Sequence, residues 1–143
     1  MKEHPIDRMR ASEQSWLDGQ QEFLNAALSV LEGLRALIPN TEEVVIRLAR
    51  QRIYMTVPWD LFNDPDFLLA LNSVADTENA PDLNSGGNLE RVFYLPDYWT
   101  IRVTLVDTRA HCNILERERV ETEVRRHVEY EMESLCPGLR GIT

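Results

Sequence analysis

The sequence predicts an α+β fold, a single domain with the element order α-ββ-α-ββ(β)-α in which an antiparallel sheet packs against helices. Two observations predict it. Apolar residues recur at three- and four-residue spacings in three segments, which is typical of amphipathic helices, and they alternate with polar residues in two segments, which is typical of half-buried strands. The chain of 143 residues has the size of one domain, 1–143, with its own core.

The first periodic segment covers residues 12–38 and predicts one long amphipathic helix. Ser12 suits the N-cap position, and Pro39 marks the end. The segment before it, residues 1–11, is charged and is expected to form a flexible N-terminus. The apolar stripe consists of Trp16, Phe23, Ala27, Leu31, Leu34 and Ile38.

Residues 44–57 change to a period of two, which predicts a β-hairpin with one buried face. Val44, Ile46 and Leu48 alternate with more exposed positions, and a tight connection lies near Arg50 and Gln51. The turn lacks an Asn-Gly or Asp-Gly pair, so a continuous helix remains the alternative for this segment.

A second helix is predicted to begin near Asp64, because a capping residue, Pro65 and the acidic Asp66 stand in the order that helix starts prefer. The polar residues that follow, 77–88, predict an acidic loop.

Residues 89–106 alternate again and predict a strand pair with a turn at Pro96-Asp97. For residues 110–115 a third strand and an early start of the last helix are both open. That last helix is predicted for residues 116–135, followed by a C-terminal tail at 137–143. Its apolar face consists of Val120, Val124, Val128, Met132 and Leu135.

The formal net charge of −9 is concentrated in the centre of the chain, since residues 53–90 hold seven acidic and no basic residues. Such a chain should repel nucleic-acid phosphates, and it lacks the basic clusters of membrane-surface proteins. The N-terminus has no secretory signal, and no apolar stretch is long enough for a membrane span. We therefore expect a cytoplasmic protein that binds neither nucleic acid nor membranes.

The sequence predicts no catalytic residue, no metal ligand and no cofactor. Cys112 and Cys136 are expected to be buried thiols, with a single bridge as the alternative. His111 and Cys112 are adjacent, and no pair of ligands has the spacing of a structural zinc site. An enzyme whose site is assembled from scattered residues stays an open alternative, which a polar-lined pocket would favour.

The order helix, strand pair, helix, strand pair, helix over residues 12–135, in a small acidic chain, resembles the small secretion chaperones of type III systems and the related YbjN-like domains. The resemblance implies a dimeric α/β protein whose first helix and sheet hold an extended segment of a client protein. It is one of topology and composition, so it carries over no site residue.

Together these observations predict an acidic protein-binding module, such as a chaperone, adaptor or inhibitor, that contacts another protein with a basic surface. The predicted contact residues are Asp76 just before the acidic loop, Glu78 and Asp82 within it, and the aromatic residues Trp16 and Trp59. A homodimer is compatible with this prediction. The alternative is a structural subunit of a larger assembly, including one of a phage or mobile element.

Overall fold

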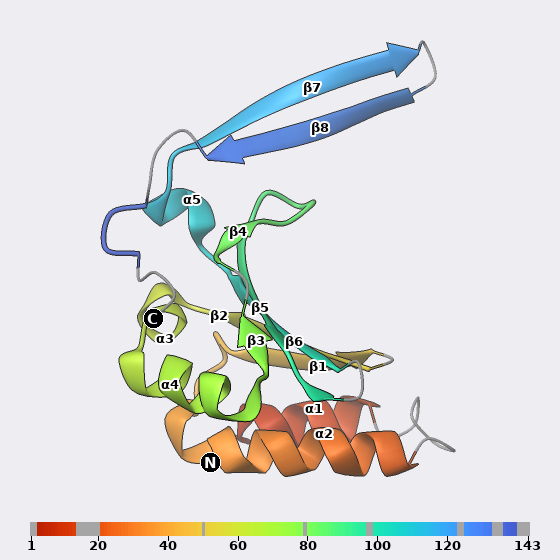
Figure 1. The fold of residues 1–143 in the computed structure, drawn as a ribbon, viewed down its shortest axis with the longest axis vertical. Coiled ribbons are helices and arrows are strands. Elements are labelled where there is room, and N and C mark those ends of the chain that lie inside the picture. The colour runs from red at the N-terminus through yellow and green to blue at the C-terminus, as the bar shows by residue number, and fades with distance from the viewer. Residues whose placement is uncertain are drawn as a thin grey trace.

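The computed structural model describes residues 3–13, 21–49, 51–78, 80–96, 99–122, 125–132 and 136–139. Its helices and its mixed sheet confirm the predicted α+β class (Figure 1). In chain order the elements are α1 (Pro5–Glu13), α2 (Gln21–Leu34), the 3-10 helix η1 (Arg35–Leu37), β1 (Val45–Ala49), β2 (Arg52–Val57), α3 (Trp59–Phe62), α4 (Pro65–Val74), β3 (Thr77–Glu78), β4 (Asp82–Leu83), β5 (Leu89–Tyr94), β6 (Thr100–Leu105), α5 (Thr108–His111), β7 (Ile114–Thr122) and β8 (Arg125–Met132).

The main sheet has the strand order β1-β2-β6-β5-β3, and β4 also pairs with β5. The strand pairs predicted at 44–57 and 89–106 are both present and antiparallel. The sheet as a whole is mixed, which corrects the antiparallel prediction, because β6 lies between β2 and β5 and runs parallel to β2. Ile53 of β2 is thereby paired with Ile101 of β6.

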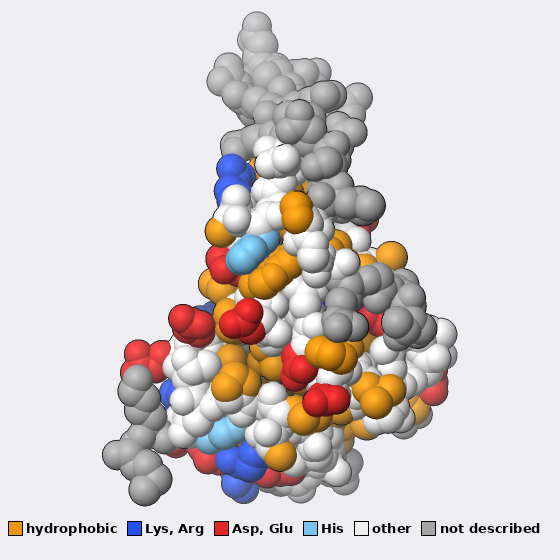
Figure 2. Space-filling model, turned by 90° about the vertical axis from the view of Figure 1, so that its left-hand side faces the viewer, with side chains coloured by type: hydrophobic (Ala, Val, Ile, Leu, Met, Phe, Trp, Pro, Cys, Tyr) orange, Lys and Arg blue, Asp and Glu red, His pale blue; other side chains and the backbone are white. Residues whose placement is uncertain are grey.

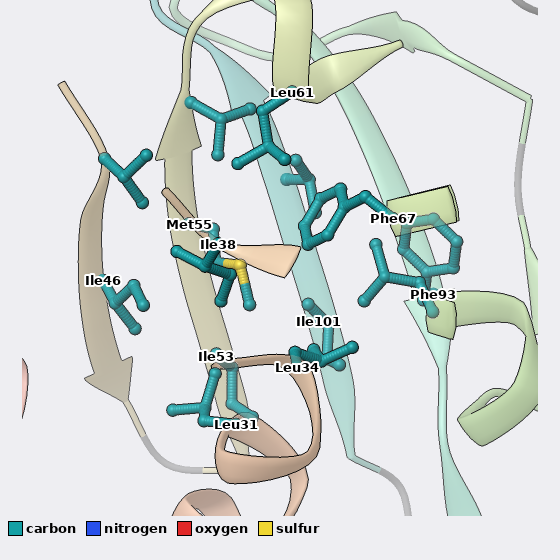
Figure 3. Close-up of a cluster of buried hydrophobic side chains, with 14 of the residues drawn as sticks. Leu31, Leu34, Ile38, Ile46, Ile53, Met55, Leu61, Phe67, Phe93 and Ile101 are labelled. Carbon is teal, nitrogen blue, oxygen red and sulfur yellow. The ribbon is translucent and has the colours of Figure 1, made fainter. Parts of the chain in front are cut away.

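One face of the sheet is buried against the helices. Ile53, Met55 and Val57 of β2 and the corresponding residues of β6 point into this core, whereas the residues between them are partly or fully exposed. Helices α1 to α4 gather below and to the left of the sheet in Figure 1. Figure 3 shows how side chains of α2, of the strands and of α4 meet in this core. The opposite face, which we call the open face, carries Arg47 of β1, Arg52 and Tyr54 of β2, Glu90 and Tyr94 of β5, and Arg102 of β6.

The prediction of a flexible segment at residues 1–11 is wrong for its described part. Residues from Pro5 onward form α1, whose Ile6 and Met9 are buried in the core. Arg8 ties this helix to the entrance of β1, because its guanidinium donates to the carbonyl oxygens of Thr41 and Val44, each at 2.8 Å. The N-terminal helix is therefore part of the folded body.

The single helix predicted for residues 12–38 is also corrected. Residues 5–13 and 21–34 form two helices that lie side by side in Figure 1, and residues 14–20 lie outside the described part. The second helix, at 65–74, is confirmed, and the side chain of Asp64 caps it by accepting a hydrogen bond from the backbone N–H of Asp66 at 3.4 Å.

Within the described ranges, no helix combines the length and the apolar character that crossing a bilayer requires.

The last helix predicted at 116–135 is wrong. Residues 114–122 and 125–132 instead form the antiparallel strands β7 and β8, which pair with each other in a separate two-stranded sheet. This hairpin, which we call the arm, projects from one end of the body in Figure 1. For residues 110–115, the sequence allowed either a strand or the start of a helix. In the structure, α5 ends at His111 and β7 begins at Ile114.

The two cysteines form a disulfide, which corrects the expectation of two thiols. Cys112 stands just before β7 and Cys136 follows β8, so the bond closes the base of the arm, and both residues are buried in the core. The spacing of 24 residues gave no hint of this closure, because in a helix these positions would lie far apart. Strands that return antiparallel bring them together.

Candidate binding site on the open face

Arginine and tyrosine side chains gather on the open face. The strand register places Tyr54 of β2 between Arg47 of β1 and Arg102 of β6. Arg52 and Tyr94 lie on the same face, one at each side of Thr100. Arg47, Arg52 and Tyr94 are exposed. A chain with a net charge of −9 thus presents a sheet face on which arginine outnumbers acidic residues.

A pocket of about 600 Å³ is hollowed into this face. Its floor consists of Arg52 and Tyr54 from β2, Arg102 and Thr104 from β6, and Glu90 from β5. One wall is the loop of residues 83–88, from which all but Gly87 line the pocket. The volume lies within the range of small-ligand sites, and the lining is mostly polar.

The wall of the pocket is held in one conformation by Asn84. Its side-chain oxygen accepts hydrogen bonds from the backbone N–H groups of Gly86 at 2.9 Å and Asn88 at 3.1 Å. Its backbone N–H donates to the carbonyl of Asn88, and its carbonyl accepts from Gly87. Asparagine stabilises turns in this way. The pocket is therefore largely formed before any ligand enters.

The charged groups on the floor are ordered by Glu90. Arg102 Nη1 donates to Glu90 Oε1 at 3.0 Å, and the Thr104 hydroxyl donates to Oε2 at 3.1 Å. Arg102 Nε is buried and has no hydrogen-bond partner among the described residues. At the other side, Arg52 Nη1 donates to the Tyr54 hydroxyl at 3.2 Å, and this hydrogen bond raises the pKa of Arg52. Both guanidinium groups are charged at any physiological pH.

The lining consists mainly of arginine, asparagine and hydroxyl side chains. Neither His nor Cys lines the pocket, and both oxygens of Glu90 already accept hydrogen bonds. Ser85 lies in the wall loop, and Glu90 is the carboxylate of the lining. In the part of the chain that is described, no three His, Cys, Asp or Glu side chains come close enough to hold a metal ion.

The contact residues predicted from the sequence do not form one surface. Glu78 is buried, with a side chain only 5% exposed, and lies 3.7 Å from the guanidinium of Arg91. Asp76 and Asp82 are exposed, and Asp82 caps its own loop by accepting from the N–H of Leu83. The acidic loop is thus anchored by its central carboxylate, which corrects the prediction that all three acids face a partner.

Of the two aromatic residues predicted as contacts, Trp59 lies in the described part of the chain. Trp59 is partly buried against the core and stacks on His111, with ring centroids 4.2 Å apart. This stacking joins α3 to α5. Trp16 lies outside the described residues.

Acidic side chains gather instead on the side of α3 and α4, where Asp60 and Asp66 are exposed. Figure 2, which views the molecule from this side, shows carboxylates spread between hydrophobic patches, with few lysine or arginine side chains. Leu69 of α4 is 70% exposed and contributes to the apolar character of this side. Among the side chains described in the body, acidic groups therefore lie on the side of α3 and α4, and arginine residues lie on the open face.

The pocket could not be recognised from the sequence, because its charged residues come from three strands. Arg52, Glu90 and Arg102 meet only after β6 has inserted between β2 and β5. The one available signal was the row of polar residues that alternate with the core positions of β2 and β6. Comparison with known proteins adds no further information, since no family model, no curated protein and no solved structure matches the chain.

Proposed function

We propose that the chain is a protein-binding module that acts by contact, and that its contact surface is the open face of the sheet. The observation that carries this proposal is the cluster of Arg47, Arg52, Arg102, Tyr54 and Tyr94 on one face that no described helix covers. Arginine and tyrosine are enriched where proteins bind one another, because both combine apolar contact area with hydrogen-bonding groups.

The charge of this face also indicates the kind of partner. The sequence led us to expect a partner with a basic surface, held by the acidic loop. Glu78 is engaged with Arg91 inside the protein, which removes the central acid of that loop from the contact. An arginine-rich open face instead complements a partner with an acidic surface, and such complementarity accelerates association at low salt.

Affinity capture with matched variants tests this proposal. The double variant R47E/Y94A changes two exposed residues of the open face that do not line the pocket. The control R10E changes an exposed arginine of α1. Compared with the wild type, R47E/Y94A should capture at least tenfold less of a partner protein, and R10E should capture the same amount. Equal capture by both variants would reject the open face as the contact surface.

A second candidate function, a structural subunit of a larger assembly, is supported by the arm. Its two strands pair only with each other, so their outer edges have no strand partner in the described part of the chain. Isolated two-stranded hairpins are marginally stable, and free strand edges readily pair with other strands. If the arm assembles copies of this chain, light scattering should give a mass above 16.6 kDa for the wild type. Replacing residues 115–132 by a short Gly-Ser linker should then return the monomer mass.

The compartment is part of the proposal as well. The sequence led us to expect the cytoplasm, but a disulfide between two buried cysteines favours an oxidising compartment. Alkylation of the protein from its native source, before and after reduction, tests this with mass spectrometry. If both cysteines are alkylated without reduction, they are free thiols, and the result would favour a reducing compartment.

A further inference from the structure

The guanidinium of Arg102 is held from one side only. Its Nη1 is bound to Glu90, whereas its Nε is buried and has no partner among the described residues. A buried donor that stays unpaired is unfavourable, and native structures rarely leave one without water or a ligand. Arg102 lines the pocket, so a turn of its guanidinium toward the pocket would pair this donor with an acceptor bound there.

The pocket supplies one net positive charge for that acceptor. Arg52 and Arg102 contribute two positive charges, and Glu90 contributes one negative charge that is already bound to Arg102 and Thr104. A single carboxylate balances this excess. A phosphate monoester, which carries nearly two negative charges, would place its additional charge beside Glu90.

The geometry of the donors agrees with a carboxylate. The Nε–H and one Nη–H of an arginine point in parallel and match the two oxygens of a planar carboxylate. The wall loop is fixed by Asn84, so little ordering is required when the ligand enters. Asn84, Asn88 and Tyr54 also line the pocket, and their amide and hydroxyl groups can bind a neighbouring peptide group.

From these observations we infer that the pocket binds the carboxylate of a glutamate or aspartate side chain in an extended segment of the partner protein, with Arg102 as its main ligand and Arg52 as the second. This inference rests on the proposed function, because the open face continues from the pocket toward Arg47 and Tyr94 and gives the flanking residues of such a segment a surface to lie on.

Nuclear magnetic resonance can test the inference with two peptides, acetyl-Thr-Thr-Glu-Thr-Thr-amide and the same peptide with Gln in place of Glu. We expect the glutamate peptide to shift the Nε–H resonance of Arg102 in a saturable manner that weakens with added salt. The glutamine peptide should bind at least tenfold more weakly. R102K, which lacks the guanidinium fork, and R52Q should each reduce binding by at least fivefold, and R35Q, outside the pocket, should leave it unchanged.

Three results would overturn the inference. These are no shift of the Arg102 resonance, equal binding of the two peptides, and tighter binding of a phosphothreonine peptide than of the glutamate peptide. Because R102K could disturb the fold, R52Q serves as the second variant, since Arg52 is exposed. The capture experiment changes Arg47 and Tyr94, which do not line the pocket. If the peptides do not bind, the capture experiment therefore still tests the proposed function.

Discussion

Arg91 is the largest side chain that is fully buried in the described core. Its Nε donates to the carbonyl of Phe62 at 3.2 Å, its guanidinium lies 4.6 Å from the centre of the Phe62 ring, and Nη1 faces Glu78 at 3.7 Å. Burial lowers the pKa of Arg91, and the Coulomb interaction with Glu78 opposes this shift. The pair links the short strand β3, which contains Glu78, to β5, which contains Arg91, on the core side of the sheet.

Neutralising one member of this pair should be costly. We expect E78Q to lower the free energy of unfolding by about 3 kcal/mol, because it removes the carboxylate that faces a buried guanidinium. The double variant R91M/E78L should be more stable than E78Q alone, since apolar residues of similar size often replace a buried ion pair at little cost. Urea denaturation measures both. A change below about 0.5 kcal/mol for E78Q would mean that the pair is effectively solvated.

At the scale of elements, Arg35 joins α1 to α2. Its guanidinium binds Asp7 of α1 at 3.0 Å and Glu32 of α2 at 2.7 Å. The hydrogen bonds from Arg35 lower the pKa of both carboxyl groups below their ordinary values. Because the folded-state pKa values are the lower ones, the stabilisation is complete above the unfolded pKa of about 4 and is lost as the pH falls further.

Acid titration of stability tests this link. The urea midpoint of the wild type should exceed that of R35Q at pH 7 by a small amount, since all three groups are partly solvated. The difference should shrink as the pH is lowered from 5 to 2. R47Q, which removes an exposed arginine of β1 that contributes to neither pKa shift, is the control. A difference that grows on acidification would contradict the assignment.

The wall loop meets the arm at Gly87. This residue has φ of +79°, and a Cβ added there would lie 2.7 Å from the ring atom Cδ1 of Tyr130 in β8. Gly86 is the matched neighbour, because its Cβ would have no contact closer than 3.4 Å. The loop that forms one side of the pocket therefore also supports the arm.

We expect G87A to destabilise the protein by at least about 1 kcal/mol, the cost of a left-handed backbone at a residue with a side chain, and to displace Tyr130. G86A should change the stability far less. Thermal unfolding measures the first effect, and the rate of proteolysis within residues 114–132 measures the second. If G86A and G87A behave alike, the arm does not rest on this loop.

The elements that could be predicted are those whose sequence signal is local. Asp64, Pro65 and Asp66 specify a helix start, and the alternation in β6 allows only a strand. The arm was missed because Val120, Val124, Val128 and Met132 are spaced by four, which satisfies a period of two as well as a helical turn. The β-branched valines favour the strand, but only the pairing of β7 with β8 decides between the two.

At the scale of the whole molecule, the arm and the body are linked chiefly at the arm's base. The described hydrophobic core comes from residues 6–112 and Cys136, with Ile114 and Leu139 packed against it from the two chain segments beside the disulfide. Trp59 and His111 stack beneath this junction. The body thus has a core that does not depend on the outer part of the arm.

Replacing residues 115–132 by a short Gly-Ser linker, with Cys112 and Cys136 retained, should leave cooperative unfolding of the body at nearly the wild-type urea concentration. Reducing the disulfide should have the larger effect, about 2–4 kcal/mol, because it releases the loop that joins the two cysteines. Circular dichroism follows both transitions. Loss of cooperative unfolding in the linker variant would show that the arm is part of the core.

The position of β6 has a consequence during synthesis of the protein. This strand lies between β2 and β5, yet both of its neighbours leave the ribosome before it does. Until β6 emerges, the nascent chain holds two separate parts of the sheet. Each part has a strand edge whose backbone groups are unpaired and an apolar face that is exposed. A pause in translation after β5 has emerged and before β6 does would prolong that interval, during which molecular chaperones that recognise extended apolar segments can bind.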